Sequence, residues 1–292
     1  MSPSGRDVPE TGFPGFLRSR RARITPEQAG LPPHSGVRRV PGLRREEVAR
    51  LAGVSIDYYI QLERGGGAGV SASVLESLAR ALQLNDTERA HLFALAHSAQ
   101  QRPRPRAPQR PRPGLLRVVE TLTEVPAFLL GYRLDILATN RLALALHVGL
   151  GDLHADERNM VRYVFVHDAA RTLYADWAET AREVVGALRL HASHHPHDPQ
   201  LAQLVGELSG VDRDFRRWWA EHDVYRPQCG STRYNHPLVG ELTLDYEALN
   251  APDDPHQALV LSTANPGSPS EKALRLLAEG RPPTSDGPAS RA

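Results

Sequence analysis

The sequence predicts two domains of different class: an all-helical N-terminal domain, and a C-terminal α+β domain in which helices are inserted into an antiparallel sheet. A chain of 292 residues is long enough for two domains with separate cores. Residues 1–113 contain 18 arginines and 10 carboxylates, whereas residues 114–292 contain 17 basic and 24 acidic residues. The two halves therefore carry net charges of +8 and −7, and only the N-terminal half suits a polyanion.

Five helices are predicted in the N-terminal domain, which we place at residues 14–98. Residues 1–13 and 281–292 lack hydrophobic periodicity, and we expect both ends to be disordered. An arginine-rich helix is predicted from Phe16 to Arg23, and Asp86 is expected to cap the last helix. The other four helices are predicted at residues 44–52, 55–64, 73–84 and 87–99.

Alternating prolines and arginines mark residues 99–114 as a linker. The run QRPRPRAPQRPRPG cannot form a helix, and its arginines repel one another, so an extended and solvated spacer is expected. These arginines either contact DNA phosphates or serve only within a linker, and the composition favours the second interpretation.

The C-terminal domain, predicted over residues 115–280, begins with a helix at residues 115–122 and a β-hairpin. The hairpin strands are the runs AFLLG and LDILA, which flank a turn near Tyr132. In a later strand, alternating Leu242 and Leu244 predict one buried and one solvated face. Helices are expected to begin near Asn140, Glu157, Asp168, Trp177, Asp198 and Asp212, and strands at Glu241 and Gln257.

The stretch RREEVARLAGVSIDYYIQLERG, residues 44–65, has the mechanical features of a helix-turn-helix. Gly53 allows a sharp change of direction between the helices, and Ser55 can cap the second helix. On the polar face of that helix, Gln61 can pair with adenine and Asp57 can accept a hydrogen bond from cytosine N4. The candidate base-reading residues are Ser55, Ile56, Asp57, Tyr58 and Gln61, and the candidate phosphate contacts are Arg44, Arg45 and Arg64.

The motif EEVARLAGVS, followed by YYIQLERG and VLESLARALQL, resembles the helix-turn-helix domain of the Cro/lambda-repressor (XRE) type over residues 14–98. The resemblance implies that Ile56, Asp57 and Gln61 face bases and that Arg45 lies by a phosphate. The alternative is an ordinary helical bundle with a solvated basic face. The coincidence of turn, core spacing and charge favours the DNA-binding interpretation.

The acidic half contains the series RTLYADWAETAREVVGALR, HDPQLAQLVGEL, DFRRWWAEHDV, HPLVGELTLDYEAL and LVLSTANPGSPSEKAL. In this order the segments resemble the ligand-binding domain of MmyB-like transcription regulators over residues 115–280. The resemblance implies a PAS-like antiparallel sheet with helices, and a fatty-acid-like ligand.

A set of mostly apolar residues either lines a ligand slot or fills a closed core. For a single side chain core packing is the more frequent role, and only the resemblance favours the slot. If an acyl chain binds, each buried methylene contributes about 0.8 kcal/mol, so two carbons change affinity by roughly tenfold. The candidate pocket residues are Phe128, Leu130, Leu134, Ile136, Asn140, Phe215, Trp218, His222, Leu242 and Leu244.

Two segments suggest chemistry that their surroundings do not support. His191 and His195 have metal-binding spacing on a helix, but no carboxylate or cysteine ligand lies in register, so no metal site is predicted. Cys229 lies near His222 and His236, but the motif fits no catalytic frame, so no enzyme is predicted. A single cysteine and the lack of a signal segment or a long apolar run predict a soluble cytoplasmic protein without membrane insertion.

The sequence thus predicts a sequence-specific transcription regulator that binds double-stranded DNA and senses a small apolar ligand. No cofactor is expected other than this fatty-acid-like ligand. A single helix-turn-helix makes few base contacts, so we expect a homodimer on two half-sites about 10 to 10.5 bp apart. The alternative is a DNA-anchored interaction protein whose C-terminal core is filled and binds a protein partner.

Overall fold

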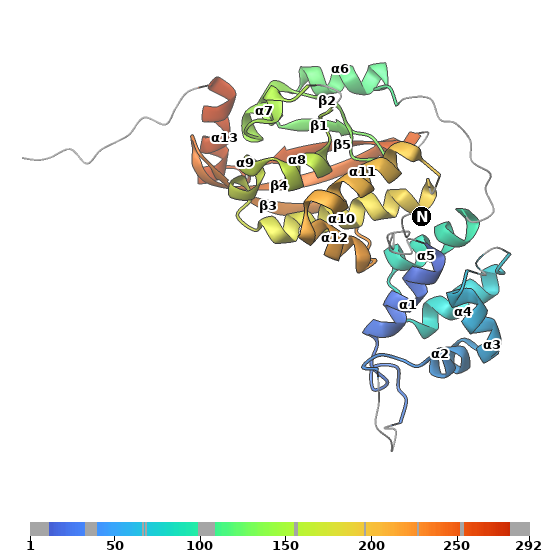
Figure 1. Ribbon diagram of the computed structural model, residues 1–292. Coiled ribbons are helices and arrows are strands. Elements are labelled where there is room, and N and C mark those ends of the chain that lie inside the picture. Colours follow the sequence, from blue (N-terminus) through green and yellow to red (C-terminus); the bar gives the residue numbers. More distant parts are fainter. Residues whose placement is uncertain are drawn as a thin grey trace, which may run out of the picture. The chain divides into compact units, whose positions relative to one another are not determined.

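The computed structural model divides into two units, each assembled from two separate segments of chain. The first combines Met1–Pro105 with Val185–Arg226, and the second combines Arg106–Val184 with Pro227–Ala292. Figure 1 shows the order of the elements along the chain by colour. The structure describes residues 12–32, 40–65, 67, 69–98, 109–154, 157–195, 197–226, 228–251 and 254–280.

Five helices at the start of the first unit share an apolar core. Phe16, Leu17, Val48, Tyr59 and Leu62 are fully buried within it. The helices are α1 (Phe13–Arg23), α2 (Arg45–Ala52), α3 (Ile56–Glu63), α4 (Ala72–Ala81) and α5 (Asp86–Ser98). All five predicted helices are confirmed, because their apolar periodicity and caps are encoded locally.

The cap of α5 is Asn85 and not the predicted Asp86. Asn85 Oδ1 accepts a hydrogen bond from the backbone N–H of Glu88 at 2.9 Å. Glu88 Oε2 in turn accepts from the backbone N–H of Asn85 at 3.2 Å. This reciprocal pair is a capping box. The prediction was wrong by one residue because Asn and Asp are equally good caps.

The second segment of the first unit contains the C-terminal part of α10 (Trp177–His194), α11 (Pro199–Val211) and α12 (Arg213–Ala220). The side chains of Asp198 and Asp212 cap α11 and α12 by accepting backbone hydrogen bonds. We expected these helices in the C-terminal domain, yet they group with the N-terminal helices. Periodicity identifies an apolar helix face, but it does not identify the surface that covers the face.

The second unit contains a five-stranded antiparallel sheet in the order β2-β1-β5-β4-β3. The strands are β1 (Ala127–Leu130), β2 (Ile136–Thr139), β3 (Cys229–His236), β4 (Gly240–Ala251) and β5 (Asp254–Thr263). The predicted hairpin and the strands predicted at Glu241 and Gln257 are confirmed. Strand β3 was not predicted, because Tyr234 and His236 are its only buried residues and the remainder is polar or small.

The sheet is accompanied by α6 (Pro113–Thr121), α7 (Arg141–Leu146), α8 (Met160–Val166), α9 (Asp168–Leu173), α13 (Pro269–Glu279) and the short 3-10 helix Leu150–Asp152. Val119 of α6 packs against Ala127, Leu129 and Leu259, so α6 covers one face of the sheet. Helix α13, which was not predicted from the sequence, contacts β4 and α7.

The end of the predicted linker is held against the sheet. Gln257 Nε2 donates to the carbonyl of Arg110 at 3.0 Å, and Gln257 Oε1 accepts from the backbone N–H of Arg112 at 3.2 Å. Residues 109–112 are therefore bound and do not form a solvated spacer. Residues 99–108, and the two ends that we expected to be disordered apart from Gly12 and Phe13, lie outside the described residues.

Candidate DNA interface and ligand-binding unit

The turn between α2 and α3 is built as the sequence predicts. Gly53 adopts a left-handed conformation with φ 67°, and its N–H donates to the carbonyls of Ala49 and Arg50. The hydroxyl of Ser55 accepts a hydrogen bond from the backbone N–H of Tyr58 at 3.2 Å and caps α3. A left-handed residue followed by an N-cap reverses the chain in few residues. This geometry fixes α3 against α2.

Helix α3 presents two different faces. Tyr59 and Leu62 are fully buried in the helical core, whereas Ile56, Asp57 and Gln61 are exposed, with Ile56 at 42%. A single exposed isoleucine is ordinary on a protein surface, but here it shares one helix face with exposed polar groups. The exposed face can thus offer an apolar contact, an acceptor and an amide to the edges of bases.

Two other residues that we predicted to contact bases are less accessible to DNA. Tyr58 is partly buried and packs against the helical core, and Ser55 uses its hydroxyl as the acceptor of the cap. The Ser55 hydroxyl keeps its own proton and can still donate one hydrogen bond. The structure therefore brings all five predicted residues together on or beside α3 but gives Ser55 and Tyr58 structural duties as well.

A buried carboxylate at the end of α3 was not foreseen. Glu63 is 1% exposed and accepts hydrogen bonds from Arg21 Nε and Arg45 Nε, each at 2.6 Å. Burial raises the pKa of Glu63, but the hydrogen bonds from Arg21 and Arg45 outweigh it and hold the pKa below the usual value. Arg18 adds a bond to the backbone carbonyl of Glu63 at 2.9 Å. The carboxylate therefore ties α1 and α2 to α3.

This carboxylate also changes the expected role of Arg45. Half of the Arg45 side chain is exposed, but its Nε is paired with Glu63. Arg44 is partly buried, and its backbone N–H donates to Glu47 Oε2 at 2.6 Å. Arg64, directly after α3, is exposed. Of the three predicted phosphate contacts, Arg64 has the clearest approach to solvent.

Three of the predicted pocket residues share one face of the sheet. Phe128 lies on the opposite face of β1 from Leu129, and Leu242 pairs directly across the sheet with Tyr234. The ring of His147 contacts both Phe128 and Tyr234, at centroid distances of 4.9 and 5.9 Å, so these residues face the same side. Leu244 follows Leu242 by two positions and lies on that side too.

An aromatic cluster, which we define as His147, Tyr163, Tyr174 and Tyr234, covers this face. The rings of Tyr163 and Tyr174 lie 5.8 and 6.2 Å from that of His147. Burial lowers the pKa of His147 to about 4, and a hydrogen bond from its Nδ1 to the carbonyl of Ala143 opposes the shift. The imidazole is therefore neutral near pH 7. Sequence reasoning missed this cluster because its members are far apart in the chain.

The other predicted pocket residues, apart from Asn140, fall into two groups. Leu134 and Ile136 are buried and Leu130 is partly buried in the hairpin. Phe215 and Trp218 are buried in α12, and His222 follows that helix with a positive φ of 59°. These three residues belong to the first unit, whereas the hairpin belongs to the second.

Asn140 has a structural role that leaves its amide no open position. Its Oδ1 accepts from the backbone N–H groups of Ala127 and Ala143, at 3.2 and 2.9 Å. Its Nδ2 donates to the carbonyls of Leu122 and Val125, at 2.6 and 2.7 Å. An asparagine side chain has two donors and two acceptor positions, and all four are used here. The predicted ligand contact of Asn140 is therefore replaced by the capping of α7.

The residues whose sequence context suggested metal or thiol chemistry have ordinary surroundings in the fold. The exposed Cys229 begins β3, and His236 Nε2 lies 3.0 Å from the carbonyl of Ala145. Among the described residues, no group of three or more His, Cys, Asp or Glu side chains is arranged to hold a metal ion. In the described part of the chain, no helix is both long and apolar enough to cross a membrane.

A capped second helix with an exposed polar face, held on a basic helical domain, defines a helix-turn-helix DNA-binding protein. Comparison with known families agrees: a family described as "Helix-turn-helix domain" matches residues 15–92. The family "MmyB-like transcription regulator ligand binding domain" matches residues 111–277, more than half of the chain, and the chain belongs to this family. No curated protein matches the chain significantly.

Together the two matches define a ligand-responsive DNA-binding transcription regulator with an XRE-like helix-turn-helix. Both families are those of transcription regulators and not of enzymes. The resemblances read from the sequence motifs are thereby confirmed at the level of family.

Proposed function

We propose that the protein binds an operator by placing α3 in the major groove, where Ile56, Asp57 and Gln61 read bases. The division of α3 into a buried face and an exposed face is the observation that supports this proposal. Ser55 and Tyr58 are additional base contacts, and Arg44, Arg45 and Arg64 neutralise phosphates. We also infer that the protein acts in the cytoplasm, where it reaches its operator.

The DNA proposal is tested with an operator obtained by in vitro selection from random duplexes. Fluorescence anisotropy then compares Gln61→Ala with Gln200→Ala, an exposed glutamine on α11. We expect Gln61→Ala to lose discrimination at one base position by roughly tenfold to 100-fold, and Gln200→Ala to behave as the parent. An equal loss on every DNA sequence would contradict base reading by Gln61.

Phosphate contacts give a different signature from base contacts. Arg64→Ala should weaken binding to all sequences and reduce the slope of log affinity against log salt by about 1. Arg45→Ala should do the same and also lower the stability of the fold, since Arg45 pairs with Glu63. A salt slope that is unchanged in Arg64→Ala would remove this residue from the interface.

We further propose that the protein binds DNA as a homodimer. One recognition helix covers few base pairs, and specific operators normally require two. Light scattering of the protein on its selected operator should give two chains, and the operator should contain half-sites about 10 to 10.5 bp apart. One chain per operator without internal symmetry would refute this stoichiometry.

The second unit is proposed to be a PAS-like domain that binds a fatty-acid-like molecule. Support comes from the antiparallel sheet with helices between β2 and β3, and from the apolar face formed by Phe128, Leu242 and Leu244. The family description supplies the ligand-binding role but names no ligand. Chain length should matter moderately, with about tenfold in affinity for two methylenes.

Native mass spectrometry of freshly purified protein tests the ligand directly. A lipid-sized adduct near one per chain, identified after solvent extraction, would support the proposal. A bare mass that stays unchanged after incubation with acyl chains of several lengths would favour a filled core. The unit would then serve a protein partner, an alternative consistent with the aromatic cluster that covers the sheet.

A further inference from the structure

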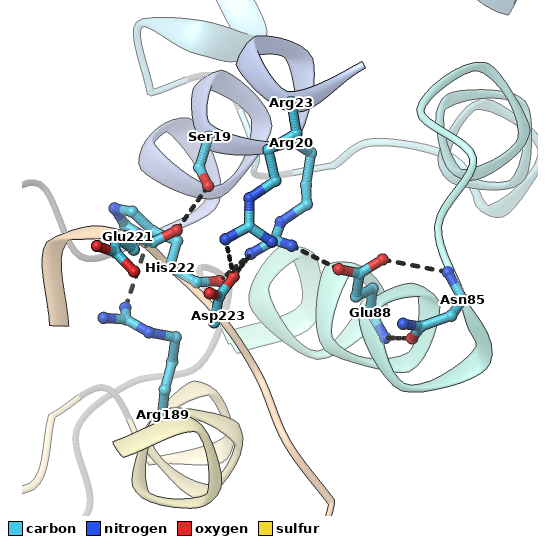
Figure 2. Close-up of polar contacts among 9 residues, drawn as sticks. All are labelled: Ser19, Arg20, Arg23, Asn85, Glu88, Arg189, Glu221, His222 and Asp223. Atoms are coloured by element: carbon cyan, nitrogen blue, oxygen red, sulfur yellow. Dashed lines mark hydrogen bonds and ion pairs between the residues drawn. The ribbon is translucent and has the colours of Figure 1, made fainter. Parts of the chain in front are cut away.

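A group of polar contacts joins α1 to the residues that follow α12, within the first unit (Figure 2). Arg20 Nη1 donates to Glu88 Oε1, and Arg20 Nη2 donates to the carbonyl of His222 and to Asp223 Oδ1. The hydroxyl of Ser19 donates to the carbonyl of Glu221 at 2.8 Å. Arg20 is thus buried with two carboxylates and a carbonyl as acceptors.

Arg189 on α10 lies beside this group, but its contacts differ from those of Arg20. It is 4% exposed, and its Nη1 is 3.4 Å from His222 Nδ1. Its guanidinium also stacks over the ring of Trp219, 4.1 Å from the centroid. The buried Nε and Nη2 atoms have no hydrogen-bond acceptor among the described residues, and neither has the indole N–H of Trp219. Figure 2 shows the Arg189 side chain directed toward the Glu221–Asp223 segment.

Two carboxylates of this group are already engaged elsewhere. Glu88 pairs with Arg20, and Asp223 pairs with both Arg20 and Arg23. No described carboxylate forms an ion pair with Arg189. A buried cation without a counter-charge costs several kcal/mol, and most buried polar groups in native proteins have a partner.

The titratable neighbours do not supply the missing negative charge. Burial, followed by the charges of Arg189, Arg20 and Arg18, lowers the pKa of His222 to about 3, although Asp223 opposes the shift. Burial, followed by Arg189, Arg20, His194 and His222, lowers the pKa of His91 well below its usual value. Both imidazoles are therefore neutral near pH 7. The charge of Asp223 acts favourably on Arg189, but Asp223 is already paired with Arg20 and Arg23.

We propose that Arg189, together with Trp219 and His222, forms a buried binding site for an anionic group of the carboxylate class. The planar guanidinium offers Nε and Nη2 side by side, which is the arrangement that a carboxylate accepts in a bidentate manner. The indole N–H of Trp219 is a further donor without an acceptor. The carboxylate is either the headgroup of an acyl ligand or a small free anion. The two alternatives give different results in the titration described below.

Occupancy of this site acts on the contact with the DNA-binding helices through one residue. The ring of His222 contacts Arg189, and its backbone carbonyl accepts a hydrogen bond from Arg20 of α1. An anion on Arg189 changes the electrostatic field at His222 and hence the strength of the Arg20 contact. If the carboxylate is carried on an acyl chain, the inference rests on the proposed ligand class, and the site itself lies within the first unit.

Three probes separate the two sources of the carboxylate. The full chain is titrated with sodium laurate, with 1-dodecanol, which has the same chain without the charge, and with sodium acetate, while the melting temperature and the calorimetric affinity are measured. We expect laurate to bind about tenfold to 100-fold more tightly than dodecanol, as for a charge-assisted hydrogen bond. An effect of acetate alone would identify a small free anion as the occupant.

Arg189→Met removes the charge at similar length, and Arg213→Met, on exposed Arg213 of α12, is the matched control. In Arg189→Met the preference for laurate over dodecanol, or the acetate effect, should disappear. In Arg213→Met it should remain.

Three results would overturn the site. Equal binding of laurate and dodecanol without an acetate effect would leave an apolar pocket, and with it the proposed ligand function, but no anion site. A laurate preference that survives in Arg189→Met would place the carboxylate elsewhere. If none of the probes binds, water alone satisfies Arg189. The operator experiments are independent of all three outcomes.

Should Arg189→Met fail to fold, the parent protein still decides the question. The carboxyl carbon of bound [1-13C]laurate, followed by NMR during acidification, should stay ionised below the pH at which a free carboxylate is protonated. Protonation at or above that pH would place the headgroup away from a guanidinium and would overturn the proposal.

Discussion

Two buried charges in the first unit, Glu63 and Arg189, differ in what surrounds them. Glu63 accepts hydrogen bonds at 2.6 Å from both Arg21 and Arg45. Arg189 has a long contact with the neutral His222 and a stacked ring, Trp219, but no ion-pair partner among the described residues. Both side chains are less than 5% exposed. The chain therefore completes the environment of one charge and leaves the other to a component from outside.

The difference separates a structural ion pair from a candidate binding site. A paired buried charge is weak evidence of function, because ion pairs hold many folds in register. A buried charge whose hydrogen-bond donors have no acceptor lowers the stability of the fold, and a ligand that supplies the acceptors restores that stability. The two sites should therefore behave oppositely when their charge is removed.

The largest effect is expected from Glu63→Gln. The substitution leaves Arg21, which is 15% exposed, beside a neutral amide in a buried place, and should lower the free energy of unfolding by about 3 kcal/mol. Urea denaturation followed by circular dichroism measures it. Glu76→Gln removes the exposed pair with Arg89 and should cost much less than Glu63→Gln, because solvent screens that pair. Similar losses in the two variants would mean that burial of Glu63 has no energetic consequence.

The aromatic cluster in the second unit extends the comparison to a buried group without charge. The pKa of His147 is about 4 in the fold and about 6.5 in the unfolded chain. Between these two pH values only the unfolded chain binds a proton at this ring. The contribution of His147 to the free energy of unfolding is therefore fully present above pH 6.5 and is lost as the pH falls toward 4. The loss is on the order of 3 kcal/mol.

This pH dependence is checked by urea unfolding of His147→Leu at pH 7 and pH 5. The variant should lose less stability on acidification than the parent. Phe128→Leu disturbs the same cluster without removing a titratable ring, and should lower stability by the same amount at both pH values. An acid sensitivity that is identical in the parent and His147→Leu would assign the loss to other groups.

The opposite sign is expected for Arg189→Met in buffer without carboxylates. Replacing an unpaired buried cation by an apolar chain of similar length should raise the free energy of unfolding by about 1 to 2 kcal/mol, after loss of the stacking on Trp219. Arg213→Met should change it by less than about 0.5 kcal/mol. A clear loss of stability in Arg189→Met would show that the chain and water already satisfy this cation.

The smallest effect is expected at the N-terminal cap of α5, in which Asn85 pairs with Glu88. Asn85→Ala removes one half of the capping box and should cost about 1 kcal/mol. Asp86→Ala, at the position that the sequence predicted, should cost clearly less, because Asp86 is the first residue of the helix. The reverse order, in the same urea experiment, would mean that the box is not formed in solution.

Most local features of the fold could be predicted from the sequence. The five N-terminal helices, the turn at Gly53, the cap at Ser55 and the hairpin of β1 and β2 depend on neighbours in the chain. The exposed face of α3 was predictable for the same reason. Strand β3 was missed because its residues, apart from Tyr234, are polar or small and show no apolar period.

The sites built from distant segments could not be predicted. Asn140 was expected beside a ligand, yet backbone groups of Leu122, Val125 and Ala127 use its amide. Cys229 and His191, which stood out in the sequence, belong to no metal group among the described residues. Arg189 attracted no attention, because an arginine within an amphipathic helix is usually solvated.

The sequence by itself determined the class of each domain, the helix-turn-helix and the family, since periodicity, caps and motif order are properties of the chain. Only the tertiary structure decided that Glu63 would be neutralised by Arg21 and Arg45, and that Arg189 would be buried near carboxylates already engaged by Arg20 and Arg23. The physical reason is that the cost of a buried charge depends on partners that folding brings from elsewhere in the chain.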